Sequence, residues 1–122
     1  MSRTDELNSA LSNLQASSAD VEACAVVSED GLIIASSLPQ SMEEDHIAAM
    51  SAVMLSMGGR TAQELKRGEL EQLYVKGKNG YVIISHAGAH SSLIVITRKE
   101  AKLGLIFLDM SRTASEIASI LS

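Results

Sequence analysis

The fold is decided by the stretch LYVKGKNGYVIISHAGAHSSLIVIT, which runs from Leu73 to Thr97. It contains three apolar runs separated by two connections that carry glycine. The second and third runs are apolar at almost every position, whereas a strand with one face in water alternates apolar and polar residues. These runs therefore predict strands that are covered on both faces, and the few remaining segments of the chain must supply the cover.

The chain as a whole has the length and composition of one globular domain. It has 122 residues, 46% hydrophobic and 20% charged, so we expect a single domain over residues 1–122. Aromatic residues make up 2% and the formal net charge is −5, which disfavours nucleic acid and an anionic membrane as direct partners. The N-terminus is polar and the one cysteine, Cys24, has no internal disulfide partner, so we expect a cytoplasmic protein.

The first half of the chain predicts a helix, two strands and a second helix. Apolar residues at helical spacing predict the first helix over residues 4–16. Two apolar runs rich in small residues, 21–28 and 31–36, predict strands joined at an Asp-Gly turn. Apolar residues then recur every three or four positions over residues 41–66, which predicts a long second helix.

The second helix has three features that a core helix of a small domain does not need. Ser41 and Glu44 match a capping box at its start. Gly58 and Gly59 lie inside it, where they either permit close approach of another helix or kink this one. Methionines and small residues form an apolar stripe wider than one face of a small sheet requires.

The second half of the chain predicts three strands and a final helix. Residues 69–76 form a less apolar run that predicts the third strand, and residues 80–87 and 92–97 predict the fourth and fifth. Asn79-Gly80 is a hairpin signal, so neighbouring strands are expected to be antiparallel. Helical spacing over residues 99–121 predicts the third helix, and the three helices must divide between the two faces of the sheet.

The third predicted strand is the expected edge of the sheet. The fourth and fifth strands are too apolar to be exposed, whereas residues 69–76 form a short and less apolar run. Methionine at helical spacing in the preceding helix has two interpretations. It packs the core, or it joins the strand edge in a two-fold interface between identical subunits.

No pattern in the sequence predicts catalysis, a metal site or a cofactor. His86 and His90 fall in a strand end and a loop with no acidic or cysteine cluster beside them, which favours ordinary loop histidines over metal ligands. Cys24 lies inside an apolar strand and is expected to be an inert core residue. Gly77-Lys78 lacks the first glycine and the following Ser or Thr of a phosphate-binding loop, so we expect no nucleotide site.

Three phrases of the sequence, in this order and spacing, resemble the Roadblock (dynein-light-chain) family. They are Val26–Ser36, Gly77–Ile84 and Ala101–Leu105, which opens the final helix. Within that family, the chain resembles the prokaryotic branch typified by the gliding-motility regulator MglB. The resemblance implies an α+β fold, a three-layer α/β/α profilin-like sandwich of order αββαβββα with strand order 2-1-5-4-3. It also implies a homodimer in which the third strands pair and the second helices pack together.

The resemblance further implies a non-catalytic protein that binds a small Ras-like GTPase on the paired second helices and stimulates GTP hydrolysis. Such a regulator reshapes the switch loops of its partner and needs no catalytic group of its own. Two competing hypotheses are a scaffold subunit of a motor or signalling complex, without effect on GTP turnover, and a small-ligand sensor. The candidate dimer residues are Leu73, Tyr74, Val75, Met50, Met54 and Met57, and the candidate partner-binding residues are Glu43, His46, Ala49 and Val53.

Overall fold

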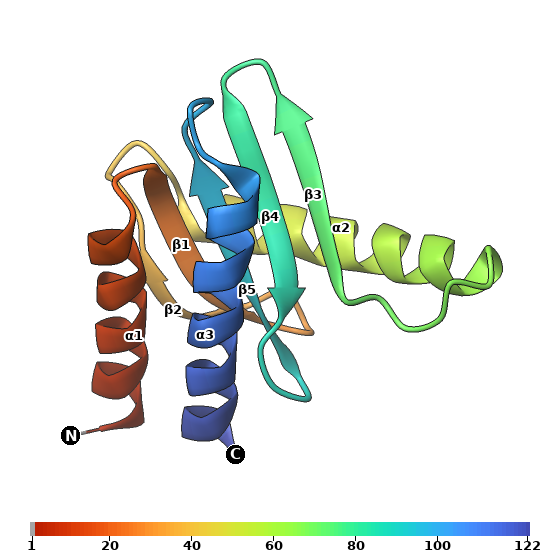
Figure 1. The fold of residues 1–122 in the computed structure, drawn as a ribbon. Coiled ribbons are helices and arrows are strands. Elements are labelled where there is room, and N and C mark those ends of the chain that lie inside the picture. Colours follow the sequence, from red (N-terminus) through yellow and green to blue (C-terminus); the bar gives the residue numbers. More distant parts are fainter. Residues whose placement is uncertain (1) are drawn as a thin grey trace.

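The computed structural model describes residues 2–122 and shows a five-stranded antiparallel sheet between two helical layers (Figure 1). This arrangement confirms the α+β sandwich and the order αββαβββα that the sequence predicts. The elements are α1 (Arg3–Ser17), β1 (Val21–Ser28), β2 (Ile33–Ser37), α2 (Glu44–Glu64), β3 (Gln72–Gly77), β4 (Gly80–His86), β5 (Ser91–Thr97) and α3 (Leu103–Leu121).

The strands lie in the order β2-β1-β5-β4-β3, and every neighbouring pair is antiparallel. β5 is buried along almost its whole length, as its continuous apolar run predicts. β3 lies at the edge of the sheet, which confirms the expectation for the least apolar strand. Gly80 holds the β3–β4 turn against the end of β5, because a Cβ there would collide with the carbonyl oxygen of Thr97. Its φ of +148° also favours glycine.

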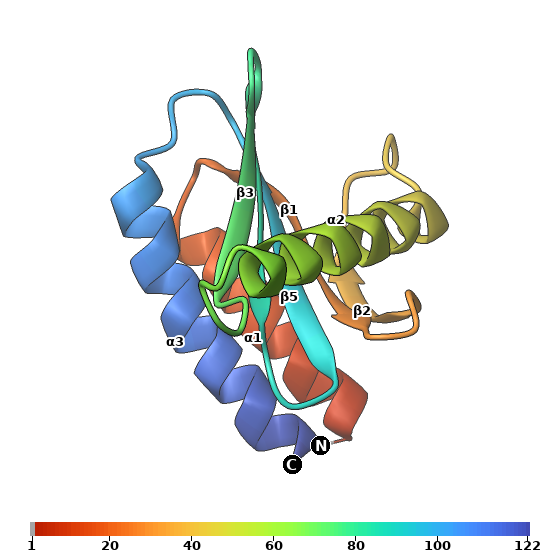
Figure 2. The same cartoon turned by 90° about the vertical axis from the view of Figure 1, so that its right-hand side faces the viewer.

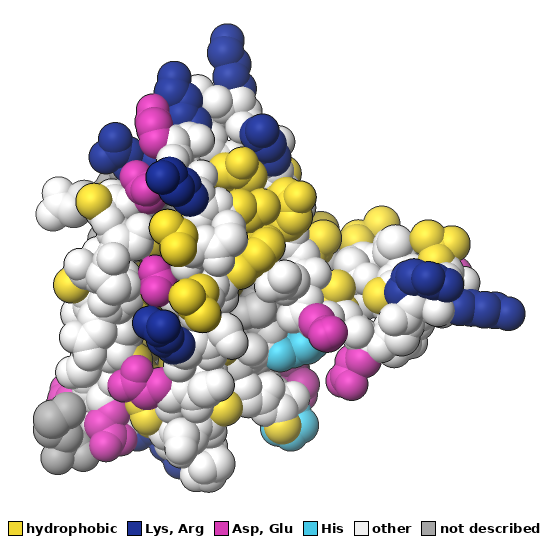
Figure 3. Space-filling view, in the orientation of Figure 1, with side chains coloured by type: hydrophobic (Ala, Val, Ile, Leu, Met, Phe, Trp, Pro, Cys, Tyr) yellow, Lys and Arg dark blue, Asp and Glu magenta, His cyan; other side chains and the backbone are white. Residues whose placement is uncertain are grey.

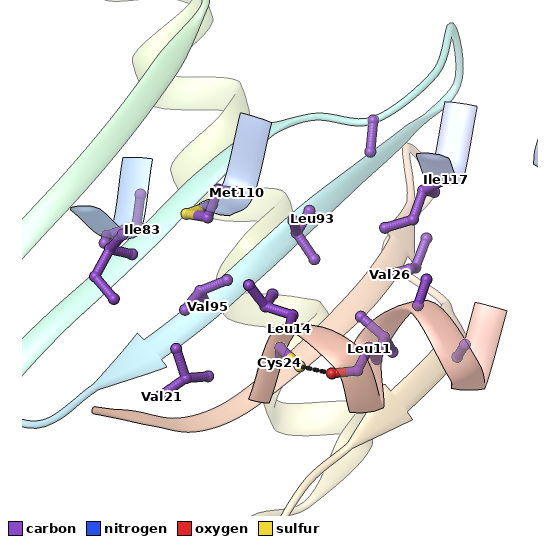
Figure 4. Close-up of a cluster of buried hydrophobic side chains, with 14 of the residues drawn as sticks. Leu11, Leu14, Val21, Cys24, Val26, Ile83, Leu93, Val95, Met110 and Ile117 are labelled. Atoms are coloured by element: carbon purple, nitrogen blue, oxygen red, sulfur yellow. Dashed lines mark hydrogen bonds between the residues drawn. The ribbon is translucent and has the colours of Figure 1, made fainter. Parts of the chain in front are cut away.

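The two faces of the sheet are covered by different helices (Figure 2). α1 and α3 lie side by side on one face, where Leu11, Leu14, Leu93 and Ile117 meet in the larger core (Figure 4). α2 crosses the other face alone, and its C-terminal half extends past β3 (Figure 1). Within residues 2–122, no helix is both long and apolar enough to span a bilayer.

α2 begins at Glu44 and ends at Glu64, so it is shorter at both ends than the predicted 41–66. The predicted capping box is absent, because Glu43 occupies the N-cap position and makes no side-chain cap hydrogen bond. The carboxylate of Glu44 instead accepts a hydrogen bond from the Ser36 hydroxyl of β2, at 3.0 Å. The Glu44 side chain therefore bonds to the preceding strand and takes no part in the local cap that the sequence pattern suggested.

α2 continues through both glycines without a break, and only Gly58 serves close packing, since a Cβ at Gly59 would have nothing within 4 Å. Gly58 is buried, and a Cβ at this position would lie 2.9 Å from Cδ2 of Leu73 and 3.3 Å from Cδ2 of Leu70. The first distance is shorter than real side chains tolerate. Gly58 therefore sets how closely α2 approaches the edge strand β3.

Candidate interaction surface

The outer edge of β3 is the first component of the candidate site. β3 pairs only with β4 within residues 2–122, so its other backbone edge has no strand beside it. Successive side chains point to opposite faces of the sheet. Leu73 and Val75 face α2 and line a groove there, whereas Tyr74 faces α3 and its ring lies 6.0 Å from that of Phe107. The strand thus presents apolar side chains on both faces beside an unpaired edge.

The second component is a stripe of exposed apolar residues on α2. Met50, Val53 and Met57 are 48%, 54% and 61% exposed and recur at helical spacing. The opposite side of the helix carries its buried residues, among them Ala48 and Gly58. Three large apolar side chains in one row on a solvent-facing helix indicate a surface that another protein covers.

A groove joins the stripe to the strand and is the third component. It has a volume of about 490 Å³ and lies between the C-terminal half of α2 and the edge strand. Its lining is almost entirely apolar. Hydrophobic side chains are also visible along the part of α2 that projects past β3 (Figure 3). We call this groove the α2/β3 groove, and its main lining residues are Val53, Met54, Met57, Leu65, Leu70, Leu73 and Val75.

The structure brings most of the predicted dimer residues together but separates two of them. Met54, Met57, Leu73 and Val75 all line the α2/β3 groove. Met50 does not line it and lies on the outer stripe of α2. The other exception is Tyr74, which lies on the opposite face of the sheet with Phe107.

The predicted partner-binding residues all lie on α2 or at its start. Glu43, His46 and Ala49 are exposed near the N-terminal end, and Val53 contributes to both the stripe and the groove. Sequence reasoning missed Leu65 and Leu70, because it assigned them to the end of a helix and to a strand. They lie in the connection after α2, which folds back under the helix. Leu65 is large and apolar but strongly exposed, and this exposure identifies it as a candidate contact residue.

The titratable groups outside this surface include one buried cysteine and one exposed histidine–glutamate pair. Burial raises the pKa of the Cys24 thiol to about 12, so it stays protonated at neutral pH. Its Sγ donates a weak hydrogen bond to the Leu11 carbonyl at 3.7 Å (Figure 4), which confirms Cys24 as a core residue. His90 Nδ1 lies 3.2 Å from Glu29 Oε2 at the surface. Within residues 2–122, no three His, Cys, Asp or Glu side chains are grouped to hold a metal ion.

Residues 7–97 match the sequence family of the Roadblock/LC7 domain, and this match covers most of the chain. The chain belongs to the Roadblock/LC7 family. This confirms the resemblance seen in the sequence. An uncharacterized protein from Methanocaldococcus jannaschii is 38% identical to this Roadblock domain over 95 residues, which cover 78% of this chain and 82% of that protein. Roadblock domains are in general non-catalytic adaptors or regulators.

Solved structures show the same fold at low sequence identity. Myxococcus xanthus MglB superposes on this Roadblock domain with a TM-score of 0.89 at 19% identity, over 99% of this chain and 91% of that chain. Profilin II from Acanthamoeba castellanii gives a TM-score of 0.66 at 16% identity, over 93% of this chain and 97% of that chain. At these identities the likeness shows the fold alone, which is the profilin-like Roadblock sandwich.

Proposed function

We propose that this Roadblock domain is a homodimeric, non-catalytic regulator that binds a small Ras-like GTPase and stimulates its GTP hydrolysis. The observation that carries the proposal is the continuous exposed apolar surface formed by α2, the α2/β3 groove and the unpaired edge of β3. The family resemblance supplies the class of partner, and the surface supplies the means of binding it.

Self-association through β3 uses the unpaired backbone groups of this edge and the apolar side chains beside it. Two copies of β3 placed antiparallel complete each other's backbone hydrogen bonds. The groove side chains, including Val75 and Met57, then leave water, and each large apolar side chain contributes about 1.5–3 kcal/mol when fully buried. A two-fold axis between antiparallel edge strands is perpendicular to the sheet, so both α2 helices lie on the same side of the dimer. The dimer therefore has one face of α2 helices and one face of α1 and α3.

The outer part of α2 then forms a docking platform for the GTPase. Met50 and Val53 provide an apolar centre, and Glu43 and His46 provide a polar rim at the N-terminal end. An apolar centre inside a polar rim is the usual composition of a protein–protein interface. A protein without a catalytic group stimulates hydrolysis by holding its partner's switch loops in the reactive arrangement.

The proposal is tested with the purified protein and a Ras-like GTPase encoded in the same genome. We expect phosphate release to rise about tenfold or more, which corresponds to about 1.4 kcal/mol of barrier. Val53→Glu should abolish the stimulation, because it places a charge in the centre of the platform. Leu108→Glu, on the opposite layer and of similar exposure, is the matched control and should keep it.

Three results separate the hypotheses. Stimulation that requires Val53 supports the regulator. Binding without a change in turnover assigns the scaffold role instead and rejects stimulation. An absence of binding in both nucleotide states rejects a GTPase partner altogether.

A further inference from the structure

The three aromatic residues of this chain meet at one place on the surface. The sequence contains two tyrosines, one phenylalanine and no tryptophan. The ring of Tyr74 lies 6.1 Å from that of Tyr81 and 6.0 Å from that of Phe107. Tyr81 and Phe107 are half-buried, whereas Tyr74 is 46% exposed, so the group is not part of the closed core. We call these three residues the aromatic corner; it lies on the α3 face of β3 and β4.

The first turns of α3 carry two further exposed apolar residues. Leu105 and Leu108 are 59% and 50% exposed, on the side of the helix away from buried Ile106 and Met110. Phe107, between them in sequence, turns toward Tyr74. Figure 3 shows hydrophobic side chains over the upper part of β3 and β4, with further ones along α3 beside them. Aromatic residues with exposed leucines beside them have the composition of the energetic centre of an interface.

Basic residues border this surface and lack acidic partners. Lys76, Lys78, Lys99 and Lys102 form no ion pair in residues 2–122. Arg98, in the same region, is paired with Asp20 and Glu100 at 3.9 and 3.6 Å. We call the four lysines the lysine rim.

The lysine rim is drawn from two connections that the fold brings together. Gly80 abuts Thr97, which places the β3–β4 turn against the connection between β5 and α3. Lys76 Nζ lies 5.9 Å from the centre of the Tyr81 ring, so the rim touches the aromatic corner. Dark blue side chains gather at the top of Figure 3 around the hydrophobic surface. A chain of net charge −5 therefore has a local excess of positive charge at one end.

We propose that the aromatic corner, Leu108 and the lysine rim form a second docking site. Its occupant is a short amphipathic segment of another protein, with apolar side chains on one face and Asp or Glu beside them. The apolar side chains pack on Leu108 and the aromatic rings, and the carboxylates meet the lysines. Charge complementarity of this kind raises the association rate and fixes the orientation of the partner.

The charge distribution favours a short acidic segment over an extended polyanion. Charges are screened over about 8 Å at physiological salt. A short segment meets only the lysines, whereas a nucleic acid or a bilayer also meets the acidic residues elsewhere on this chain. The ring of Tyr74, the most exposed of the three, also lies at 61° to that of Tyr81 and 57° to that of Phe107, so it forms a parallel platform for stacked bases with neither of them.

The site is independent of the proposed GTPase platform. It lies on the α1/α3 side of the sheet, opposite α2. Tyr74 belongs to the edge strand and also lies in the predicted dimer surface, so a change at Tyr74 would affect both. Lys78, Lys102 and Leu108 lie outside β3, and substitutions there test this site alone.

The test uses a fluorescent synthetic helix of about 18 residues, long enough to be helical when bound. It carries leucine on one face and glutamate on the other, and its matched control has lysine in place of glutamate. We expect the acidic peptide to bind at least ten times more tightly than the basic one, with amide shift changes centred on Tyr81, Phe107 and Leu108. Lys78→Glu combined with Lys102→Glu, and separately Leu108→Glu, should each weaken binding at least tenfold.

Peptide binding and GTPase stimulation should respond in opposite ways to two substitutions, which distinguishes this proposal from the proposed function. Val53→Glu should leave peptide binding unchanged while it abolishes GTPase stimulation, and the lysine double variant should do the reverse. Equal binding of both peptides, or shift changes centred on α2, would overturn the second site. Tighter binding of an oligo-dT strand or of phosphatidylserine vesicles than of the acidic peptide would also overturn it.

Discussion

The helices on the two faces of the sheet differ in how many of their residues are buried against it. Within residues 2–122, sixteen buried residues form one core cluster on the α1/α3 face, and five form the cluster on the α2 face. α2 is the longest helix, with 21 residues, yet only Ala48, Ser51 and Gly58 are buried in it. α1, with 15 residues, buries four. The first face holds most of the buried core, whereas α2 carries more apolar surface than its own sheet covers, which supports the proposed role of α2 in association.

Truncating one aliphatic residue on each face is the strongest test of this difference. Leu11→Ala should lower the free energy of unfolding by about 2–5 kcal/mol, because it leaves a cavity in the larger core. Val53→Ala should change it by no more than about 0.5 kcal/mol, because that side chain is already exposed. Urea unfolding at a concentration where light scattering shows monomers measures both. Equal losses at the two positions would contradict the division of roles.

A charge on the edge strand should separate association from folding. Val75→Arg places like charges opposite each other across the proposed two-fold axis, and such contacts cost several kcal/mol. We expect a folded monomer by light scattering, with a circular dichroism spectrum like that of the parent protein. A dimer that survives this substitution would exclude β3 as the interface.

The close approach of α2 to β3 can be tested by adding one methyl group to the helix. Gly58→Ala adds a Cβ that meets Leu73 and Leu70, and overpacking of this kind costs about 1–3 kcal/mol. Gly59→Ala is the control, because nothing lies within 4 Å of a Cβ at that position. Gly58→Ala should lower the melting temperature and Gly59→Ala should not. A Gly58→Ala protein as stable as the Gly59→Ala protein would show that the helix moves freely over the strand.

The smallest effect at neutral pH is expected at Cys24. Cys24→Ala should cost about 1 kcal/mol, because it removes one small buried group. Burial raises the folded pKa of the thiol from 9.0 to about 12, so its contribution to stability is complete below pH 9 and is lost as the pH rises toward 12. In that range the parent protein should lose about 1.4 kcal/mol per pH unit more than Cys24→Ala. Parallel stability curves for the two proteins would contradict the buried thiol.

The sequence predicted the elements that depend on local pattern. The continuous apolar run around Val95 identified a covered strand, and the weaker run 69–76 identified the edge strand. The run around Ile83 identified a strand as well, but β4 is buried only at Ile83 and Ile84, because it lies next to the edge strand. Cys24 was predicted as core from its apolar neighbours alone, and the structure buries it. Periodicity and turn residues are properties of neighbouring positions, so one chain is enough to detect them.

The sequence-based predictions were wrong or incomplete where contacts outside the local pattern determine the structure. Glu44 binds Ser36 of β2 instead of closing a capping box, and no local pattern contains that partner. Leu65 and Leu70 enter the groove only because the connection between α2 and β3 folds back. The sequence analysis placed Tyr74 and Leu73 in one predicted dimer surface. The alternation of side chains along a strand already indicates that these neighbours lie on opposite faces of the sheet.

Because α2 extends beyond β3, the order of its last turns should depend on the concentration of the protein. The last turns of this helix have their own sheet beneath only part of their length, so in a lone subunit they are the easiest to fray (Figure 1). In the proposed pair, a second sheet lies under them and holds them in place. By mass action, their order then rises with the amount of protein present. The cell could set the activity of such a platform simply by how much of the chain it makes.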